Sequence, residues 1–313
     1  MKLHLKKTTA SIMAVILLVG IFPYFLSKYF EINSEKQGIH VRLSLSSGQI
    51  RTLPLEEYLI GVLAAEMPAE FEMEALKAQA VASRTYVLKR MENRTTEQTY
   101  DVDTTEKTQA WISNQEIFRK WGIINYFKYH RKMVQAVEAT SGKILTYNGQ
   151  KIDAVYYSSC GRKSTERASD VWGTETNYLT NGPSGEENPS RFVKHQVYEV
   201  EPFYKALGFN QIPLELTEKD IVILQRTKAG RVKTLKIRNK VFEATDFRTR
   251  LQLPSTDFEY RIQGKKIEII TYGKGHAVGM SQYGANDLAK SGKDYTEILR
   301  HYYQDTKIEK VYG

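Results

Sequence analysis

Glu66 is the residue best placed for acid chemistry, because it combines a carboxyl group with the apolar face of a predicted helix. On a helical wheel of residues 55–66, at about 100° per residue, Leu59 and Val62 share one face and Glu66 falls among them. Burial raises the pKa of a carboxyl group, and the negative end of the helix dipole acts in the same direction. Both effects favour a protonated general acid. A frayed last turn before Pro68, with the glutamate in solvent, is the alternative.

Arg84 is the opposite anomaly on the next predicted helix, about residues 72–91. It lies near the centre of an apolar face that includes Leu76 and Val87. A guanidinium in that position needs an anion. Direct pairing with Glu66 would lower the pKa of Glu66 and remove its acid role, so we expect another anion, from the protein or from a substrate. A structural ion pair, or a side chain that reaches solvent, is the alternative.

Other motifs give weaker indications. The segment 273–279 (GKGHAVG) spaces its glycines differently from the dinucleotide fingerprint, and the following GMSQYG is one residue too long for a GxSxG elbow. The pattern indicates a tight glycine loop, with Ser281 as the N-cap of a helix. His276 in this loop is either a ligand contact or a structural histidine. Cys160 is either a nucleophile or an isolated structural thiol.

The composition excludes several classes of protein. The chain has 313 residues, 41% of them hydrophobic, which is too many for a disordered chain. One cysteine and scattered histidines argue against disulfides and thiolate zinc sites, so we expect no metal and no cofactor. The net charge of +9 favours an anionic partner: nucleic acid, an anionic membrane or an anionic cell wall.

The N-terminal sequence predicts a membrane anchor. Residues 1–7 carry three lysines, residues 8–26 are uncharged and mostly apolar, and residues 27–38 form a polar tether. This stretch of 19 mostly apolar residues is about as long as a helix needs to be to cross a bilayer. A cleaved signal peptide, which would need a small-x-small site, and a core helix are the alternatives. With lysines before the span, a single-pass protein has a cytoplasmic N-terminus and its remaining chain outside the cell membrane. Nucleic acid is then not an expected partner.

The sequence after the tether, residues 39–313, predicts an α+β fold. We expect these residues to form one compact exported unit with a β-rich subregion at about 196–272. Residues 96–130 have no assigned structure and are expected at the surface, and residues 159–189 form a long loop of the kind that is usually functional. The remaining predicted elements are a hairpin at 39–53, helices at 55–66 and 72–91, a short helix at 134–140, paired strands at 142–147 and 151–158, strands from 220 to 272, and helices at 281–290 and 295–303.

Three blocks of sequence resemble the stage II sporulation protein D family, which includes amidase enhancers. They are EYLIGVLAAEMPAEFEMEALKAQAVASRTY (57–86), AVYYSSCGRKSTERASDVWG (154–173) and GKGHAVGMSQYGANDLAKSGKDYTEILRHYY (273–303), joined by AGRVKTLKI and FRTRLQLPSTDFEY between the last two. The likeness covers most of residues 39–313. One departure is Ala277, where the family commonly has glycine, and this matters if φ is positive there.

The resemblance implies a membrane-anchored lytic transglycosylase that cleaves peptidoglycan strands between N-acetylmuramic acid and N-acetylglucosamine during forespore engulfment. It implies a preference for strands stripped of their stem peptides by an amidase, stage II sporulation protein P, and a complex that also contains stage II sporulation protein M. The glutamate of AAEMP, here Glu66, would be the single acid and base, and the product would carry a 1,6-anhydro end. The implied substrate-binding residues are Arg84, Lys77, Ser158, Ser159, His276 and Gln282.

Arg84 is expected to contact the lactyl carboxylate that a stripped muramic residue exposes. Two other functions stay open. One is a non-catalytic wall-binding module that enhances an N-acetylmuramoyl-L-alanine amidase. The other is an ordinary hydrolase, in which Glu70 or Asp170 would be the second carboxylate.

Overall fold

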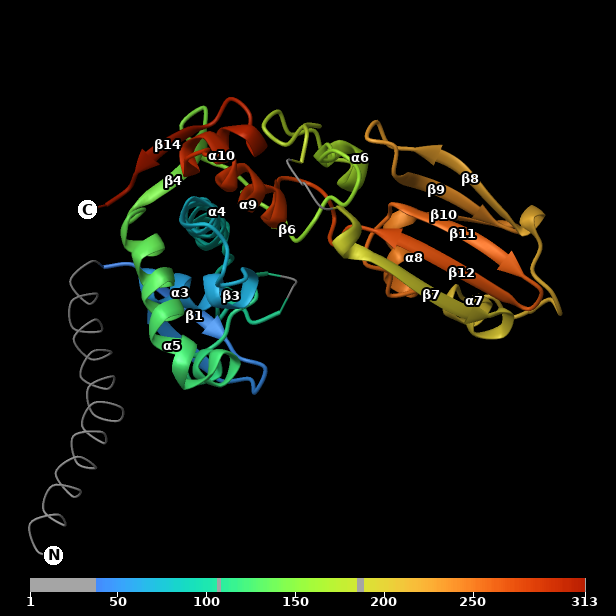
Figure 1. Cartoon of the computed structure of the whole chain (residues 1–313), viewed down its shortest axis with the longest axis horizontal. Coiled ribbons are helices and arrows are strands. Elements are labelled where there is room, and N and C mark those ends of the chain that lie inside the picture. Colours follow the sequence, from blue (N-terminus) through green and yellow to red (C-terminus); the bar gives the residue numbers. More distant parts are fainter. Residues whose placement is uncertain (1–37, 106–107, 185–188, 313) are drawn as a thin grey trace, which may run out of the picture.

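The computed structural model describes residues 38–105, 108–184 and 189–312. They form a helix-rich lobe and a β-rich lobe, which lie side by side (Figure 1). The mixed α+β class expected from the sequence is confirmed. The predicted anchor at 8–26 lies outside the described residues. Within the described ranges, no helix is both long and apolar enough to cross a bilayer.

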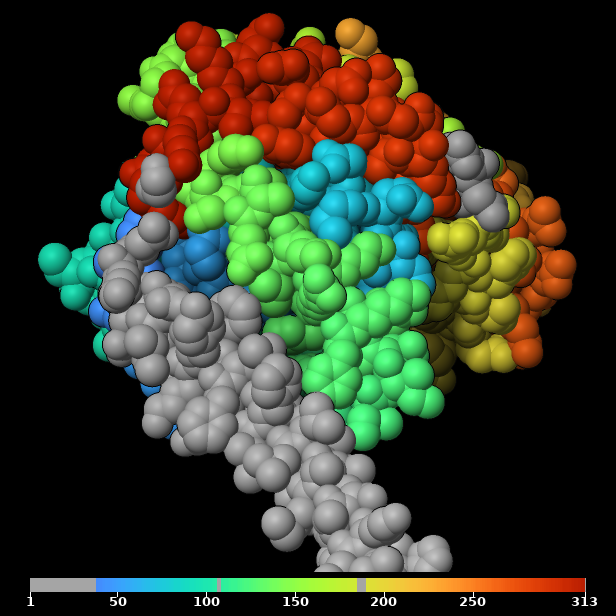
Figure 2. Space-filling view, turned by 60° about the vertical axis from the view of Figure 1, so that its left-hand side comes forward, coloured from blue at the N-terminus to red at the C-terminus, as the bar shows by residue number. Residues whose placement is uncertain are grey.

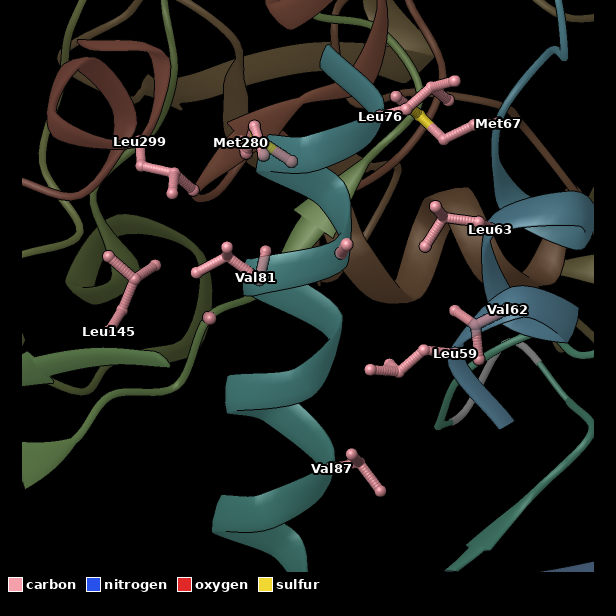
Figure 3. Close-up of a cluster of buried hydrophobic side chains, with 14 of the residues drawn as sticks. Leu59, Val62, Leu63, Met67, Leu76, Val81, Val87, Leu145, Met280 and Leu299 are labelled. Carbon is pink, nitrogen blue, oxygen red and sulfur yellow. The ribbon is translucent and has the colours of Figure 1, made fainter. Parts of the chain in front are cut away.

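The helix-rich lobe is built around one central helix. Strands β1 (His40–Ser44) and β2 (Ile50–Pro54) form an antiparallel hairpin that leads into α3 (Leu55–Glu66), followed by α4 (Met73–Glu92). Helix α4 is rich in alanine and buried along most of its length, as expected of a helix without a polar face. Figure 3 shows α4 between the side chains of α3 on one side and a second group from later in the chain on the other, namely Leu145, Met280 and Leu299.

Helix α5 (Asn114–Glu138) was not predicted in full. The sequence suggested a short helix at 134–140 and left 96–130 without assigned structure, yet α5 has 25 residues. It begins at a capping box, in which Ser113 and Glu116 bond each other's backbone N–H groups. Gly122, with φ of 68°, kinks it and hides its periodicity from a sequence pattern. The helix packs on α3 and α4, and Figure 2 shows it in green at the molecular surface.

Short strands and two C-terminal helices close this lobe. Strand β4 pairs with β5 around the predicted turn at Asn148, but the expected pairing does not extend to β6, which pairs with β13 instead. The C-terminal strand β14 covers the other edge of β4. The bounds are β3 (Val102–Asp103), β4 (Lys143–Tyr147), β5 (Gln150–Lys151), β6 (Tyr156–Tyr157), α6 (Ala168–Trp172), β13 (Met280–Ser281), α9 (Gln282–Lys290), α10 (Tyr295–Tyr302) and β14 (Lys307–Lys310).

The β-rich lobe has its own hydrophobic core, which includes Phe203, Leu235, Phe247 and Ile269. Its two antiparallel sheets have the strand orders β11-β12-β7 and β10-β9-β8. The bounds are η3 (Pro189–Phe192), β7 (Val193–Glu199), α7 (Val200–Ala206), η4 (Glu218–Asp220), β8 (Ile221–Arg226), β9 (Val232–Ile237), β10 (Lys240–Glu243), α8 (Ala244–Arg250), β11 (Phe258–Gln263) and β12 (Lys266–Tyr272).

Ion pairs connect the two lobes. Arg231, between β8 and β9, lies 3.1 Å from Glu166, and both side chains are 1% exposed. The buried carboxylate of Asp257 pairs with Arg162 at 3.2 Å and with Lys163 at 2.9 Å. Breaking a buried pair leaves an uncompensated charge, so these contacts fix the position of the β-rich lobe beside the helices.

Candidate active site

A cavity of about 790 Å³ opens where the two lobes meet. The helix-rich lobe contributes the end of α3, part of α4, β6 and the start of α9, and the β-rich lobe contributes α8 and the segment after it. The lining residues are Ala65, Glu66, Tyr86, Thr108, Ala110, Val155, Tyr156, Tyr157, Ser158, Trp172, Arg248, Thr249, Gln252, Leu253, Pro254, Lys274, Gly275, His276 and Gln282.

Glu66 lies in this cavity as the last residue of α3. Met67 already has an extended backbone, and its N–H donates to the Leu63 carbonyl at 3.0 Å, so the helix ends in an ordered turn rather than a frayed one. The Glu66 carboxyl group accepts a hydrogen bond from the Ala110 N–H on Oε1 at 3.1 Å and one from the Gln282 Nε2 on Oε2 at 3.2 Å. These donors fix the orientation of the carboxyl group toward the cavity.

A buried glutamine holds the segment that carries Ala110. The Gln109 Nε2 donates to the Ser83 carbonyl at 3.2 Å and to the Tyr156 hydroxyl at 3.1 Å, and its Oε1 accepts from the Tyr58 hydroxyl at 2.9 Å. Burial, with the nearby charge of Glu66 as a smaller cause, raises the pKa of the Tyr156 phenol well above its usual value. Tyr156 therefore remains a neutral hydroxyl near the carboxyl group of Glu66.

Gly61 lets the same segment lie directly against α3. A Cβ atom at this position would lie 2.2 Å from Nε1 of Trp111 and 2.8 Å from the Ile112 carbonyl oxygen. Only a glycine can face a neighbour at such distances without displacing it. The close contact holds residues 110–112 along the helix that ends in Glu66.

Gln282 reaches Glu66 because β13 pairs with β6 and α9 begins directly after it. Ser281 is the N-cap, accepting from the Gly284 N–H at 3.2 Å, which confirms the cap predicted from the sequence. The Gln282 side chain is 3% exposed. Its amide is therefore held in the wall of the cavity with Glu66 as a partner.

His276 lies in the same cavity between two aromatic rings. Its ring centroid is 5.4 Å from that of Tyr157 and 5.1 Å from that of Trp172. Burial, assisted by the positive charge of Arg248, lowers the pKa of His276 to about 4. Its Nδ1 accepts from the Val278 N–H at 3.1 Å, so the neutral ring carries its proton on Nε2. At neutral pH His276 is therefore an uncharged ring in the wall of the cavity, and it also hydrogen-bonds the Tyr156 backbone.

Two further residues that the sequence singled out are Ala277 and Cys160. Ala277 has φ of 67°, a left-handed conformation that glycine adopts easily and that costs an alanine free energy. Cys160 is buried with its Sγ beside the Tyr157 hydroxyl and does not line the cavity. This placement gives no support to a nucleophilic role for the thiol.

The other predicted substrate-binding residues separate into two groups. Ser158 lines the cavity with Glu66, His276 and Gln282. Ser159 lies outside it, where its hydroxyl accepts from the Gly161 N–H at 3.0 Å. Lys77 also lies outside, paired with Glu74 at 2.6 Å.

Arg84 requires a correction, because it does not reach the cavity. Its side chain is fully buried and its Nη2 lies 2.6 Å from Oε2 of Glu56 at the start of α3. The guanidinium also donates to the Lys143 carbonyl at 3.2 Å and to the Val137 carbonyl at 3.3 Å. The expectation that the anion is not Glu66 agrees with this geometry, but the anion is a protein carboxylate rather than a substrate. Arg84 joins α3, α5 and β4.

Sequence reasoning missed several lining residues. Arg248 and Lys274 bring positive charge to the cavity, and Trp172 and Tyr86 bring aromatic surface. Arg248, Lys274 and Trp172 all lie within the sequence blocks that resemble the family, which is the signal that could have found them. No arrangement typical of a metal site is present among the His, Cys, Asp and Glu side chains of the described ranges.

The carboxylates proposed for a hydrolase lie elsewhere. Glu70 is exposed, Asp170 pairs with Lys233 at 3.1 Å, and neither lines the cavity. Among the described residues that line it, Glu66 alone carries a carboxyl group. Any acid–base chemistry by a carboxyl group of the described cavity wall would therefore rest on Glu66.

Comparison with known proteins finds a family model and relatives that carry the same family name. Residues 45–147 match the family described as Stage II sporulation protein. The chain is 38% identical to Stage II sporulation protein D of Bacillus amyloliquefaciens over 273 residues, which cover 85% of this chain and 77% of that protein. It is also 38% identical to Stage II sporulation protein D of Bacillus subtilis, over 84% of this chain and 76% of that protein. The Amidase enhancer of Bacillus subtilis is 28% identical over 80% of this chain and 40% of that protein.

Proposed function

The chain belongs to the stage II sporulation protein D family, and from this membership and the single carboxyl group in the cavity we propose that it is a peptidoglycan lytic transglycosylase acting in sporulation. The substrate is a glycan strand, cleaved between N-acetylmuramic acid and N-acetylglucosamine. The scissile bond lies beside Glu66, at the junction of the lobes.

In the proposed reaction Glu66 acts first as an acid. Its proton passes to the glycosidic oxygen as the bond from that oxygen to the muramic anomeric carbon breaks, and the electron pair of the bond leaves with N-acetylglucosamine. The resulting carboxylate then takes the proton of the muramic C6 hydroxyl, whose oxygen forms a bond to the anomeric carbon. Glu66 is protonated again, no water is consumed, and the new end is a 1,6-anhydro ring.

The observation that carries this proposal is the absence of a second carboxylate among the described lining residues. Hydrolysis by the common two-carboxylate route needs a partner about 5–10 Å from the acid, as nucleophile or as base for water. Glu70 and Asp170 lie outside the cavity wall. An intramolecular attack by the substrate's own hydroxyl needs only one group that gives and then takes a proton.

The shape of the site suits a polymer. A second cavity, of about 470 Å³, shares Tyr86, Val155 and Trp172 with the first, so the strand can continue past the Trp172 ring. Trp172 is 46% exposed. An exposed aromatic face of this kind packs against the apolar face of a sugar ring.

The positive charge in the cavity suits a strand whose muramic residues carry free lactyl carboxylates. Lys274 and Arg248 take the role that the sequence assigned to Arg84. Lys274→Gln should raise KM for peptide-stripped strands several-fold more than KM for neutral chitin oligomers, with exposed Lys194→Gln as the control. An equal rise in KM for both substrates would show that Lys274 does not recognise the lactyl carboxylate.

The cellular setting is also part of the proposal. The protein would be held at the cell membrane by residues 8–26, with its lobes on the outer side, and would act with the amidase stage II sporulation protein P and with stage II sporulation protein M. Supporting results would be co-purification of the full chain with each partner from membranes, and protease access to the lobes from the outside only. A cytoplasmic location of the lobes would contradict this setting.

A second candidate function is favoured by the likeness to the Amidase enhancer. In that case the cavity binds glycan and stimulates an N-acetylmuramoyl-L-alanine amidase without cleaving the strand. Mass spectrometry of purified stripped strands, incubated with the full chain alone, separates the candidates. Products with 1,6-anhydro ends support the transglycosylase, reducing ends indicate hydrolysis, and no cleavage together with faster amidase turnover indicates an enhancer.

A further inference from the structure

The outer face of α5 carries large apolar side chains that no described element covers. Ile123 is 50% exposed, Ile124 88% and Phe127 47%, directly after the kink at Gly122. Phe118, before the kink, is 41% exposed. Contiguous exposed apolar residues mark interaction surfaces far more often than isolated ones do.

Positive charge flanks the apolar residues in the middle of α5, and the acidic residues of this helix, Glu116 and Glu138, lie near its two ends. Residues 117–137 contain five lysines and arginines and no aspartate or glutamate. Two of these cations act within the fold: Lys120 donates to the Ala64 carbonyl at 2.8 Å, and Lys132 donates to the Ala69 carbonyl at 3.1 Å. Arg119, Lys128 and Arg131 are exposed.

The spacing places both kinds of residue on one face. Ile124, Phe127, Lys128 and Arg131 are separated by three, four and seven positions, and all four are exposed. Residues that share this spacing lie on the same side of a helix. The inward side carries large apolar side chains that are buried or half-buried, such as Met133 and Tyr129. The outer face is therefore apolar at the kink and cationic one turn later.

We propose that this outer face of α5 docks on the surface of an anionic lipid bilayer. Helices with apolar and aromatic residues next to lysine and arginine bind at the headgroup level, where apolar side chains enter the acyl boundary and cations pair with lipid phosphates. The proposal concerns a second membrane contact, in the folded part of the chain, and does not depend on the reaction assigned to Glu66.

The charge pattern selects this occupant over a protein surface. A helix face whose central cations lie next to its apolar residues complements a uniformly anionic sheet of phosphates, whereas protein interfaces are usually depleted of lysine at their centre. The place where the described residues begin also agrees with a membrane on this side of the protein. The Leu55 N–H bonds the Ile39 carbonyl at 3.0 Å, so the chain enters the structure at α3, the helix on which α5 packs. A tether of the length of residues 27–38 spans up to roughly 40 Å when extended, enough for the face to reach a bilayer that holds residues 8–26.

Depth-dependent quenching tests the proposal in the full chain. An environment-sensitive fluorophore is attached at Ile124→Cys, or at Leu214→Cys in the β-rich lobe as the control, since Leu214 is 86% exposed and the one native thiol, Cys160, is buried. The protein is reconstituted in vesicles of phosphatidylcholine and phosphatidylglycerol at about 2:1, with nitroxide-labelled lipids as quenchers. We expect strong quenching at position 124 and little at position 214.

The electrostatic part is tested by lipid composition and by charge. Replacing phosphatidylglycerol by phosphatidylcholine should reduce quenching at position 124. Lys128→Gln and Arg131→Gln should each lower the ratio of docked to undocked protein by about fivefold, the equivalent of about 1 kcal/mol per cation near an anionic surface. Quenching at position 124 no greater than at 214 would overturn the proposal and would indicate a protein partner for the face. Quenching insensitive to lipid charge and to both variants would overturn it as well.

Discussion

The side-chain amide of Gln282 donates a hydrogen bond to Oε2 of Glu66 across 3.2 Å, although 216 positions separate the two residues in the chain. The contact joins the first residue of α9 to the last residue of α3. It complements the Ala110 N–H on Oε1, so each oxygen of the carboxyl group has a donor from a different part of the chain.

Gln282→Ala removes one of these donors without placing a larger group in the cavity. The carboxyl group then samples orientations that do not face the scissile bond. We expect kcat on stripped strands to fall by roughly 10- to 100-fold with little change in KM, because positioned acid–base catalysis is worth factors of this size. Steady-state release of anhydro ends measures it, and the exposed Gln225→Ala is the control. Unchanged kcat would show that the contact with Glu66 has no catalytic value.

Gly61→Ala tests the support behind Ala110. In a helix interior this change normally stabilises a protein by up to about 1 kcal/mol. Here the new Cβ would lie 2.2 Å from the Trp111 ring, so we expect a loss of about 1–3 kcal/mol in the free energy of unfolding, measured in urea, and a lower kcat. Gly182→Ala is a matched control, since its nearest neighbour is 3.8 Å away. A gain in stability for Gly61→Ala would refute the close approach.

Arg84→Met leaves the half-buried Glu56 carboxylate without the fully buried cation that it pairs with. Removing one partner of a buried pair costs about 3–5 kcal/mol, and replacing both restores much of the loss. The single variant should therefore unfold at a much lower urea concentration, and Glu56→Gln/Arg84→Met should recover most of the difference. If Arg84 contacted muramic carboxylates instead, the variant would keep its stability and lose affinity for stripped strands only.

The depressed pKa of His276, about 4, predicts a pH dependence of stability. An unfolded histidine titrates near pH 6.5, so between these values the unfolded state binds more protons. The neutral His276 thus contributes its full stabilisation above about pH 6.5 and loses it as the pH falls toward 4, by about 3 kcal/mol. The measurement compares urea unfolding of wild type and His276→Asn at several pH values. A constant difference between the two proteins would show that His276 is not desolvated.

Local signals allowed most of the helix-rich lobe to be predicted. Helix α3 begins and ends where the apolar spacing after Pro54 and before Met67-Pro68 indicated, and α4 differs from its prediction by one residue at each end. The wheel also singled out Glu66, which is half-buried and lines the cavity. Helix α5 was missed because Gly122 interrupts its period.

The contacts of the site depend on long-range packing that no local pattern contains. Arg84 illustrates this, because the wheel shows an apolar face around a cation but not that Glu56 lies opposite it. Ala110 contributes only its backbone N–H, for which any residue type would serve. Arg248 and Lys274 reach the cavity only because ion pairs hold the β-rich lobe against the helices.

Product analysis of wild type and Glu66→Gln tests the central claim most directly. The amide keeps the shape of the side chain but cannot give a proton to the glycosidic oxygen. Mass spectrometry of peptide-stripped strands should show 1,6-anhydro ends with the wild type, and a decrease of at least about 10²-fold with Glu66→Gln, while binding of the strands is retained. Anhydro ends released by the purified variant at the wild-type rate would contradict the assignment of Glu66 as the acid and base.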